Sequence, residues 1–254
     1  MTARRMLWLM ASFAVAVGFV MLWQAVADAK LVSPLFLPGP DRAWAALVAG
    51  IENGILATKW LGTVERMING WLLASLAGIV IGATMGSSAT AQTYFGPFLE
   101  LIRPLPASAI IPVAIALLGL SDAMVLSVVA FGALWPMVLA TVHGFASVEP
   151  RLHEVGRTLG LSRWEFIRKI ALPSSLPDIL AGMRISLTMA LVLSVVGEML
   201  ASRDGLGNWI LLSARSFRAP DLFAGVILLG VTGLVSASLL SIAEGRLLRW
   251  RATR

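Results

Sequence analysis

Six apolar runs, each long enough to cross a lipid bilayer, constrain this chain more than any other feature of its sequence. A helix needs about 20 predominantly apolar residues to span the hydrocarbon core. The chain is 58% hydrophobic and 13% charged, which excludes an ordinary soluble domain. We therefore predict an all-α polytopic membrane protein with six transmembrane helices. The predicted spans cover residues 6–26, 63–85, 96–120, 123–145, 179–200 and 222–243.

The first run has two interpretations. Arg4 and Arg5 precede it, and Ala27-Asp28-Ala29 after it is similar to a signal-peptidase site, so the run could be a cleaved signal. It is longer than the roughly 7–15 apolar residues of a secretory core. We therefore favour a retained first span that begins in the cytoplasm.

Basic side chains set the predicted orientation. Eleven lie in segments assigned to the cytoplasm: two before the first run, five within residues 149–177 and four in the tail at 246–254; six lie in segments assigned to the outside. This bias predicts that both termini are cytoplasmic, and it accounts for the net charge of +6 without a nucleic-acid partner. The chain divides into a first span with an external loop at 1–60, a core at 61–245 and the basic tail.

The second span carries small residues at four-residue steps, namely Gly70, Ala74, Gly78, Gly82 and Gly86. Such a stripe lets another helix approach closely, which matters where lipid gives no hydrophobic drive between helices. We interpret it as a packing face, with a substrate groove as the less favoured alternative.

The fifth span repeats this spacing with Gly182, Ser186, Ala190, Ser194 and Glu198. Each four-residue step over-rotates by about 40° on a helix of 3.6 residues per turn, so the stripe cannot face a single partner. Ser186, Ser194 and Glu198 are candidates for a substrate path. Glu198, near the outer end, is equally consistent with a structural hydrogen-bonding group beneath the external loop at 201–220.

The third span is punctuated by prolines at 97, 104, 106 and 112, after a polar turn predicted at 87–95. Prolines delete backbone hydrogen bonds, and irregular backbone is tolerated at membrane depth only where protein or a water-filled cavity covers it. We expect this span to be broken and to face other helices. Glu100 and Arg103, three residues apart, could pair on one helical face.

The longest polar interval, residues 149–177, is named the finger here. Glu149-Pro150 predicts a helix start, and Gly160 predicts a break. Ser162 and Glu165 have the spacing of a capping box, which predicts a second helix start. Leu172-Pro173 is expected to end that second helix. The finger is therefore a helix-turn-helix outside the bilayer.

These residues carry a resemblance. Glu154-Val155-Gly156, Gly160 and Leu172-Pro173 resemble the EAA loop of ABC importer permeases, more narrowly those of the nitrate, sulfonate and taurine type. Arg103-Pro104-Leu105-Pro106, and Glu198 followed by Gly205-Leu206-Gly207, are similar to further motifs of that group. The resemblance covers about residues 60–245. One departure is Val155-Gly156 in place of two alanines; since glycine costs about 1 kcal/mol in a helix, the first coupling turn should be looser.

The resemblance implies a type I ABC importer permease fold in a bacterial inner membrane, working as a homodimer. It implies ATPase subunits that bind ATP and receive the finger, a soluble extracytoplasmic binding protein, and a small anion such as a sulfonate, taurine or nitrate as the solute. The implied coupling residues are Glu154, Gly156, Arg157, Thr158, Leu159, Gly160, Leu161, Ser162, Leu172 and Pro173.

No catalytic or metal-binding motif stands out in the sequence. There are no cysteines. None of the three lysines follows a glycine, as a nucleotide-binding loop of the Walker A type requires. His143 and His153 lack further ligands at metal-binding spacing. We therefore expect no enzymatic activity, no metal and no cofactor in this chain. An ion-gradient-driven carrier and a non-transporting scaffold remain the alternatives.

The loop at 201–220 is predicted to carry an interfacial helix at 209–217. Its arginines, at 203, 215 and 218, fit contacts with lipid headgroups or a binding protein better than attraction of an anionic solute.

Overall fold

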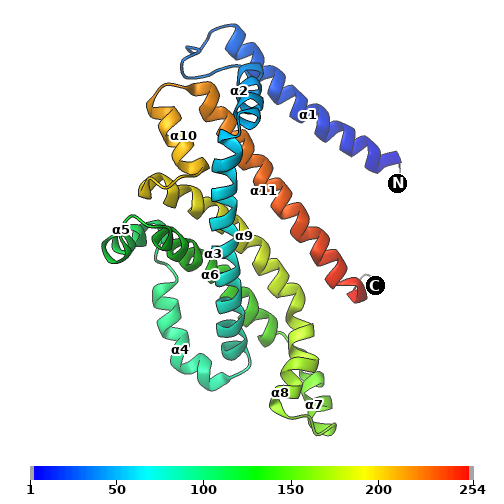
Figure 1. Cartoon of the computed structure of the whole chain (residues 1–254). Helices are drawn as coiled ribbons and strands as arrows, with labels where there is room; N and C mark the ends of the chain where they lie inside the picture. Colours follow the sequence, from blue (N-terminus) through cyan, green and yellow to red (C-terminus); the bar gives the residue numbers. More distant parts are fainter. Residues whose placement is uncertain (1–2, 252–254) are drawn as a thin grey trace.

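The computed structural model describes residues 3–251, and the regular structure within them is helical (Figure 1). The long helices are α1 (Ala3–Asp28), α3 (Ile55–Gly86), α6 (Asp122–Ala146), α9 (Leu172–Ala201) and α11 (Ala219–Leu247). The shorter helices are α2 (Pro40–Glu52), α4 (Ala89–Ile102), α5 (Ala107–Leu118), α7 (Pro150–Thr158), α8 (Arg163–Phe166) and α10 (Leu206–Arg215). A π-helix, Ile167–Ala171, joins α8 to α9, and a 3₁₀ turn, Arg249–Arg251, follows α11. Arg254 of the predicted tail lies outside the described residues.

Five helical stretches are long and apolar enough to span a membrane. They lie in α1, α3, α6, the continuous stretch Arg163–Ala201 and α11, and the α4–α5 pair makes a sixth candidate span bent by 89°. The six predicted spans are thus confirmed as five helices and one broken pair. At 1.5 Å per residue the 39-residue stretch is about 58 Å long, against a hydrocarbon core of about 30 Å. Its first turns, which belong to the finger, therefore project beyond the membrane.

The small-residue face of α3 packs directly on α6, as predicted. A Cβ on Gly70 would lie 2.3 Å from Val129 Cγ1, and one on Gly78 would lie 2.4 Å from Met137 Cβ. These distances are shorter than real Cβ contacts, so only glycine permits this helix spacing. The buried core continues from this contact onto α9.

The stripe of small and polar residues on α9 contacts different elements along its length, as its over-rotation predicts. A Cβ on Gly182 would lie 2.5 Å from Ala140 Cβ, and Ser186 Oγ donates to the Ala133 carbonyl of α6 at 2.7 Å. Sixteen residues beyond Gly182, Glu198 contacts α3 and the first turn of α10 instead.

Two predicted boundaries are wrong. Most of 87–95 is helical: the turn is confined to Ser87 and Ser88, because the Ser88 side chain accepts from Ala91 N at 3.3 Å and starts α4. Leu172-Pro173 does not end the finger's second helix either. The chain runs on through the π-helix, and Pro173 lies in the first turn of α9, directly after it.

The two ends of the bundle differ. The finger projects from one end, and α2 and α10 lie at the other (Figure 1). Leu47 and Leu56 pack there with Leu206 of α10 and Ala224 of α11. The predicted helix at 209–217 is observed at 206–215, since Phe217 adopts a left-handed φ of 54°.

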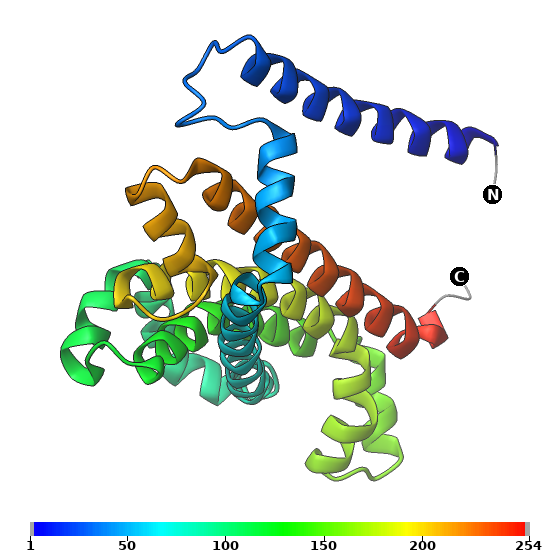
Figure 2. The ribbon, with the colours of Figure 1, turned by 45° about the horizontal axis from the view of Figure 1, so that its top comes forward.

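Helix α1 stands apart from the other long helices (Figure 2). Its link to the body lies at its C-terminal end, where Trp23 Nε1 donates to the Pro38 carbonyl at 2.9 Å and the Trp23 ring lies 5.3 Å from that of Phe223. Its apolar stretch Met10–Asp28 has no residue buried against the body.

Candidate functional site

The tip of the finger is an ordered turn between α7 and α8. Gly160 has a left-handed φ of 63°, which glycine adopts without strain. The Leu161 N–H donates to the Gly156 carbonyl at 3.0 Å, and the Gly160 N–H donates to the Arg157 carbonyl at 3.0 Å. This pair of bonds is a Schellman motif, which closes the C-terminal end of a helix. The break predicted at Gly160 is confirmed.

The predicted capping box is also present. Ser162 N donates to Glu165 Oε2 at 3.0 Å, and Glu165 N donates to Ser162 Oγ at 3.3 Å. Lys169 Nζ donates to Glu165 Oε1 at 3.0 Å. The Ser162 N–H, then Lys169, hold the pKa of the Glu165 carboxyl down at about 2. This carboxylate therefore stays ionised and the second helix start stays capped.

Gly156 is explained by packing inside the finger. It is the buried residue of α7, and a Cβ there would lie 2.7 Å from Phe166 Cδ2 of α8. The His153 ring also lies against Phe166, with centroids 4.6 Å apart. The glycine at this position thus lets α7 and α8 come together, which offsets its low helix propensity.

Apolar side chains lie exposed on the finger. Val155, Leu159 and Trp164 are 47%, 67% and 70% exposed. A polar segment that projects into water gains nothing by exposing a tryptophan and a leucine. Contact of these side chains with another protein stays a prediction.

The predicted coupling residues fall into two places. The tip brings most of them together: Glu154, Arg157, Thr158, Leu159, Gly160 and Ser162 are exposed, and Leu161 is half-buried. Leu172 and Pro173 lie apart from the tip, in the first turn of α9. Their part in coupling stays a prediction.

The finger also touches the start of the broken pair. Arg163 Nη2 donates to the carbonyl of Ser87 at 3.1 Å, in the turn between α3 and α4. Sequence spacing gave no signal for this contact, because the two residues lie 76 positions apart.

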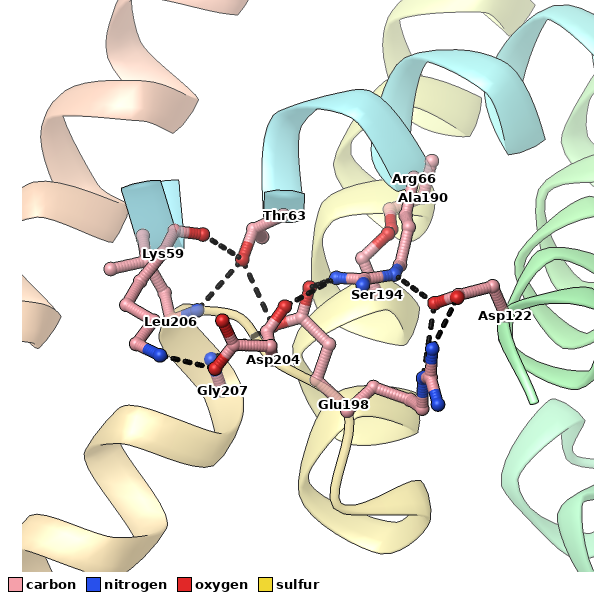
Figure 3. Close-up of polar contacts among 11 residues, drawn as sticks. Lys59, Thr63, Arg66, Asp122, Ala190, Ser194, Glu198, Asp204, Leu206 and Gly207 are labelled. Atoms are coloured by element: carbon pink, nitrogen blue, oxygen red, sulfur yellow. Dashed lines mark hydrogen bonds and ion pairs between the residues drawn. The ribbon is translucent and has the colours of Figure 1, made fainter. Parts of the chain in front are cut away.

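At the opposite end, Glu198 is the centre of a polar cluster (Figure 3). Its side chain is fully buried. Glu198 Oε2 accepts from Thr63 Oγ1 and from Gly207 N, both at 2.9 Å, and Oε1 accepts from Arg66 Nη1 at 3.0 Å. These three partners satisfy a charge that would otherwise be costly inside the protein.

Two glycines leave room for the Glu198 carboxylate. A Cβ on Gly205 would lie 2.3 Å from Glu198 Cδ, and one on Gly207 would lie 2.3 Å from the Val195 carbonyl oxygen. The Leu206 N–H between them donates to Thr63 Oγ1 at 2.8 Å. The glycine pair noted in the sequence is thus the backbone that wraps the Glu198 carboxylate.

Further charges extend the cluster toward solvent. Arg66 Nε donates to Asp122 Oδ1 at 2.9 Å, and Arg66 Nη1 donates to the Asp204 carbonyl at 2.8 Å. Arg203 pairs with Asp122, which raises the pKa of its guanidinium above the usual value. Lys59 pairs with Asp204. The cluster therefore ties α3, α6 and α9 together at one end.

The partners of Glu198 were not predicted from the sequence, and neither Arg66 nor Asp122 was assigned a role. The available signal was an acid in an apolar stripe, which requires an opposite charge from another helix.

The three candidates for a substrate path are fully buried within the protomer. Ser186 Oγ donates to Ala133 O, Ser194 Oγ donates to the Ala190 carbonyl at 2.8 Å, and Glu198 is enclosed as described. Ser186 and Glu198 bond to neighbouring helices, whereas Ser194 bonds within α9. A part of these residues in solute passage stays a prediction.

Comparison with known proteins identifies relatives over most of the chain. The family model described as "Binding-protein-dependent transport system inner membrane component" matches residues 74–251. The putative aliphatic sulfonates transport permease protein SsuC of Bacillus subtilis is 32% identical over 237 residues, covering 91% of this chain and 84% of the relative. The taurine transport system permease protein TauC of Escherichia coli is 30% identical over 235 residues, covering 90% and 85%.

A solved structure shares the fold. The chain of an amino acid ABC transporter, solved with histidines, superposes with a TM-score of 0.64 at 18% identity, covering 79% of this chain and 97% of that one. At this identity the likeness concerns the fold alone.

Proposed function

The chain belongs to the family of binding-protein-dependent transport system inner membrane components, as the permease subunit of an ABC importer, and from this premise we propose its solute, partners and coupling surface. The proposed solute is a small organic anion, an aliphatic sulfonate or taurine. The named transport activities of the two relatives support this choice.

The proposed partners are ATPase subunits at the finger and a soluble binding protein at the α2 and α10 end. Two copies of the chain would form the translocation unit. The ATP is bound by the partner, and this chain carries no cofactor. The termini lie in the cytoplasm, because the basic residues of the finger and tail favour that side.

The observation that carries the proposal is the finger. Its backbone is fixed by the Schellman motif and the capping box, while Leu159 and Trp164 stay exposed on it. A rigid turn with two uncovered apolar side chains suits insertion into a groove of another protein. Because the finger continues into α9 without a break in the helical stretch Arg163–Ala201, a push on it would reach the membrane spans.

The test is co-purification of ATPase activity with the tagged chain in mild detergent, with the neighbouring transport genes expressed alongside. We expect Leu159→Asp, and a finger carrying both Glu154→Arg and Gly160→Trp, to lose the activity. Glu149→Arg is the matched control, since it reverses a charge at the base of the finger and leaves the tip intact. Activity that stays with the tip variants would refute the docking surface. A complete lack of ATPase with well-folded wild type would favour the carrier or scaffold alternatives.

A further inference from the structure

Two hollows lie on either side of the break between α4 and α5. The first, named the α4 hollow, has a volume of about 300 Å³ and separates α4 from α6; its lining includes Pro97, Glu100, Arg103 and Val138. The second, named the α5 hollow, has a volume of about 390 Å³ between α5, α6 and α9; its lining includes Ser108, Gly132, Met189 and Val192. Trp135 of α6 lines both.

Trp135 has an unused hydrogen-bond donor. Its Nε1 atom is buried and has no partner among the described residues, although a buried indole N–H ordinarily finds one. The ring is held by edge contact with Phe131, with centroids 5.6 Å apart and planes at 79°. The side chain is thus fixed between the two hollows with a free N–H.

The backbone around Trp135 adds polar groups. Pro136 has no N–H to donate to the Gly132 carbonyl four residues earlier, and Gly132 lines the α5 hollow. The linker from Arg103 to Pro106 is non-helical, lies within the bent span and is exposed on the protomer. Irregular backbone at membrane depth persists only where protein covers it or water reaches it.

Helix α4 also requires cover by protein or water at membrane depth. None of its residues is buried in the protomer, and Glu100 within it and Arg103 directly after it both line the α4 hollow. Ionisable groups within membrane spans face a bundle interior or a water-filled cavity rather than lipid. The α4 hollow is therefore aqueous.

We propose that the transported solute passes through the two hollows in turn and that Trp135 is the gate between them. The indole N–H of Trp135 donates to an oxyanion of that solute. This inference rests on the proposed function and adds the route and the recognising residue. The solute it fits is a small organic oxyanion with an apolar part.

The lining supports that chemistry. The α5 hollow offers the Trp135 N–H and the Ser108 hydroxyl as donors among mostly apolar side chains. The α4 hollow offers the Arg103 guanidinium, whose planar donors suit an oxyanion. Glu100 lines the same hollow and offsets part of this charge, so an anion would be received there without being trapped.

The first test uses the absence of cysteine from the chain, which makes any introduced thiol the single reactive one. Ser108→Cys probes the α5 hollow and Leu139→Cys the α4 hollow. Val235→Cys on α11 is the control: it is 49% exposed but lines neither hollow. The reagent is a membrane-impermeant methanethiosulfonate bearing a sulfonate group, applied to membrane vesicles of the full chain. We expect both hollow variants to react at least about tenfold faster than the control, because only thiols in water ionise readily. Equal rates would overturn the route.

The second test concerns the gate. In inside-out vesicles, Trp135→Ala should speed modification of Ser108→Cys by about tenfold and leave Leu139→Cys unchanged, since removing the ring opens the passage. Trp135→Phe keeps the ring and removes the N–H. Ethanesulfonate should protect Ser108→Cys when Trp135 is present, and about tenfold less when it is phenylalanine, the usual effect of losing a hydrogen bond to a charged group. Unchanged rates in the alanine variant, or equal protection in both, would refute the role of Trp135.

A failure of the proposed solute route can be distinguished from a failure of the proposed function. The thiol assays need no ATPase, whereas docking is read from ATPase co-purification. If co-purification holds and the hollow thiols stay unreactive, the chain is a permease with its route elsewhere.

Discussion

Replacing Glu198 by glutamine distinguishes the two roles that the sequence left open for this residue. The amide has one acceptor oxygen and one donor nitrogen in place of two acceptor oxygens. Either it turns its N–H₂ toward the Arg66 guanidinium, or it turns it toward Thr63 and the Gly207 N–H. Both orientations place donor against donor in a site that excludes water.

The size of the stability loss follows from the interactions that the glutamine variant keeps. Removing one partner of a buried ion pair costs about 3–5 kcal/mol. Glutamine keeps the volume and one acceptor, and Arg66 keeps Asp122 and the Asp204 carbonyl, so we expect a loss of about 2–3 kcal/mol. For a chain of this size this corresponds to a fall in Tm of roughly 4–12 °C.

The assay is thermal unfolding of the purified protein in detergent, paired with limited proteolysis of the loop after α9. Thr63→Val is the companion variant, because Thr63 donates to Glu198 and accepts from Leu206 N. It should cost about 1–3 kcal/mol, and the double variant should cost less than the sum, since the two residues share one bond. An unchanged Tm in Glu198→Gln, with altered transport, would refute the structural role and assign Glu198 to the substrate path.

Three further outcomes are expected. Gly78→Leu should prevent accumulation of folded protein, because a Cβ there lies 2.4 Å from Met137 Cβ, whereas Gly230→Leu, with open space around it, should express normally; equal expression would contradict the α3–α6 contact. Gly156→Ala should weaken ATPase co-purification through its clash with Phe166, and Phe166→Leu should restore it; no rescue would mean that the glycine serves another purpose. Ser162→Ala should destabilise the finger by about 1 kcal/mol, seen as faster proteolysis within it; an unchanged digestion rate would argue against the capping box as its support.

Sequence patterns predicted the features that depend on neighbouring residues. The break at Gly160, the capping box at Ser162 and the packing face of α3 each follow from spacing within one helix or turn, and all are observed. The end predicted at Leu172-Pro173 failed for a local reason as well: a π-helix before the proline shifts the hydrogen bonding so that Pro173 falls in a first turn.

Contacts between residues far apart in the sequence could not be predicted from such patterns. Arg66 and Glu198 are 132 positions apart, and Arg163 and Ser87 are 76 apart. Arg184, inside the predicted fifth span, pairs with Glu244 near the end of α11. An isolated charge in an apolar run signals that a partner exists, but its identity depends on the packing of whole helices.

The same packing indicates which parts of the chain move together. Residues 182–186 of α9, in the stretch that begins in the finger, pack on α6, and α6 packs on the glycines of α3. The pair of Glu198 and Arg66 joins α9 to α3 at the end away from the finger. A push on the finger would therefore displace α3, α6 and α9 as one body. Helix α4 packs less firmly on this body, since it buries no residue, and Arg163 holds only the turn at its start to the finger. Relative movement would then concentrate at the hollows on either side of Trp135, so the finger can control access there without any strain within the packed body.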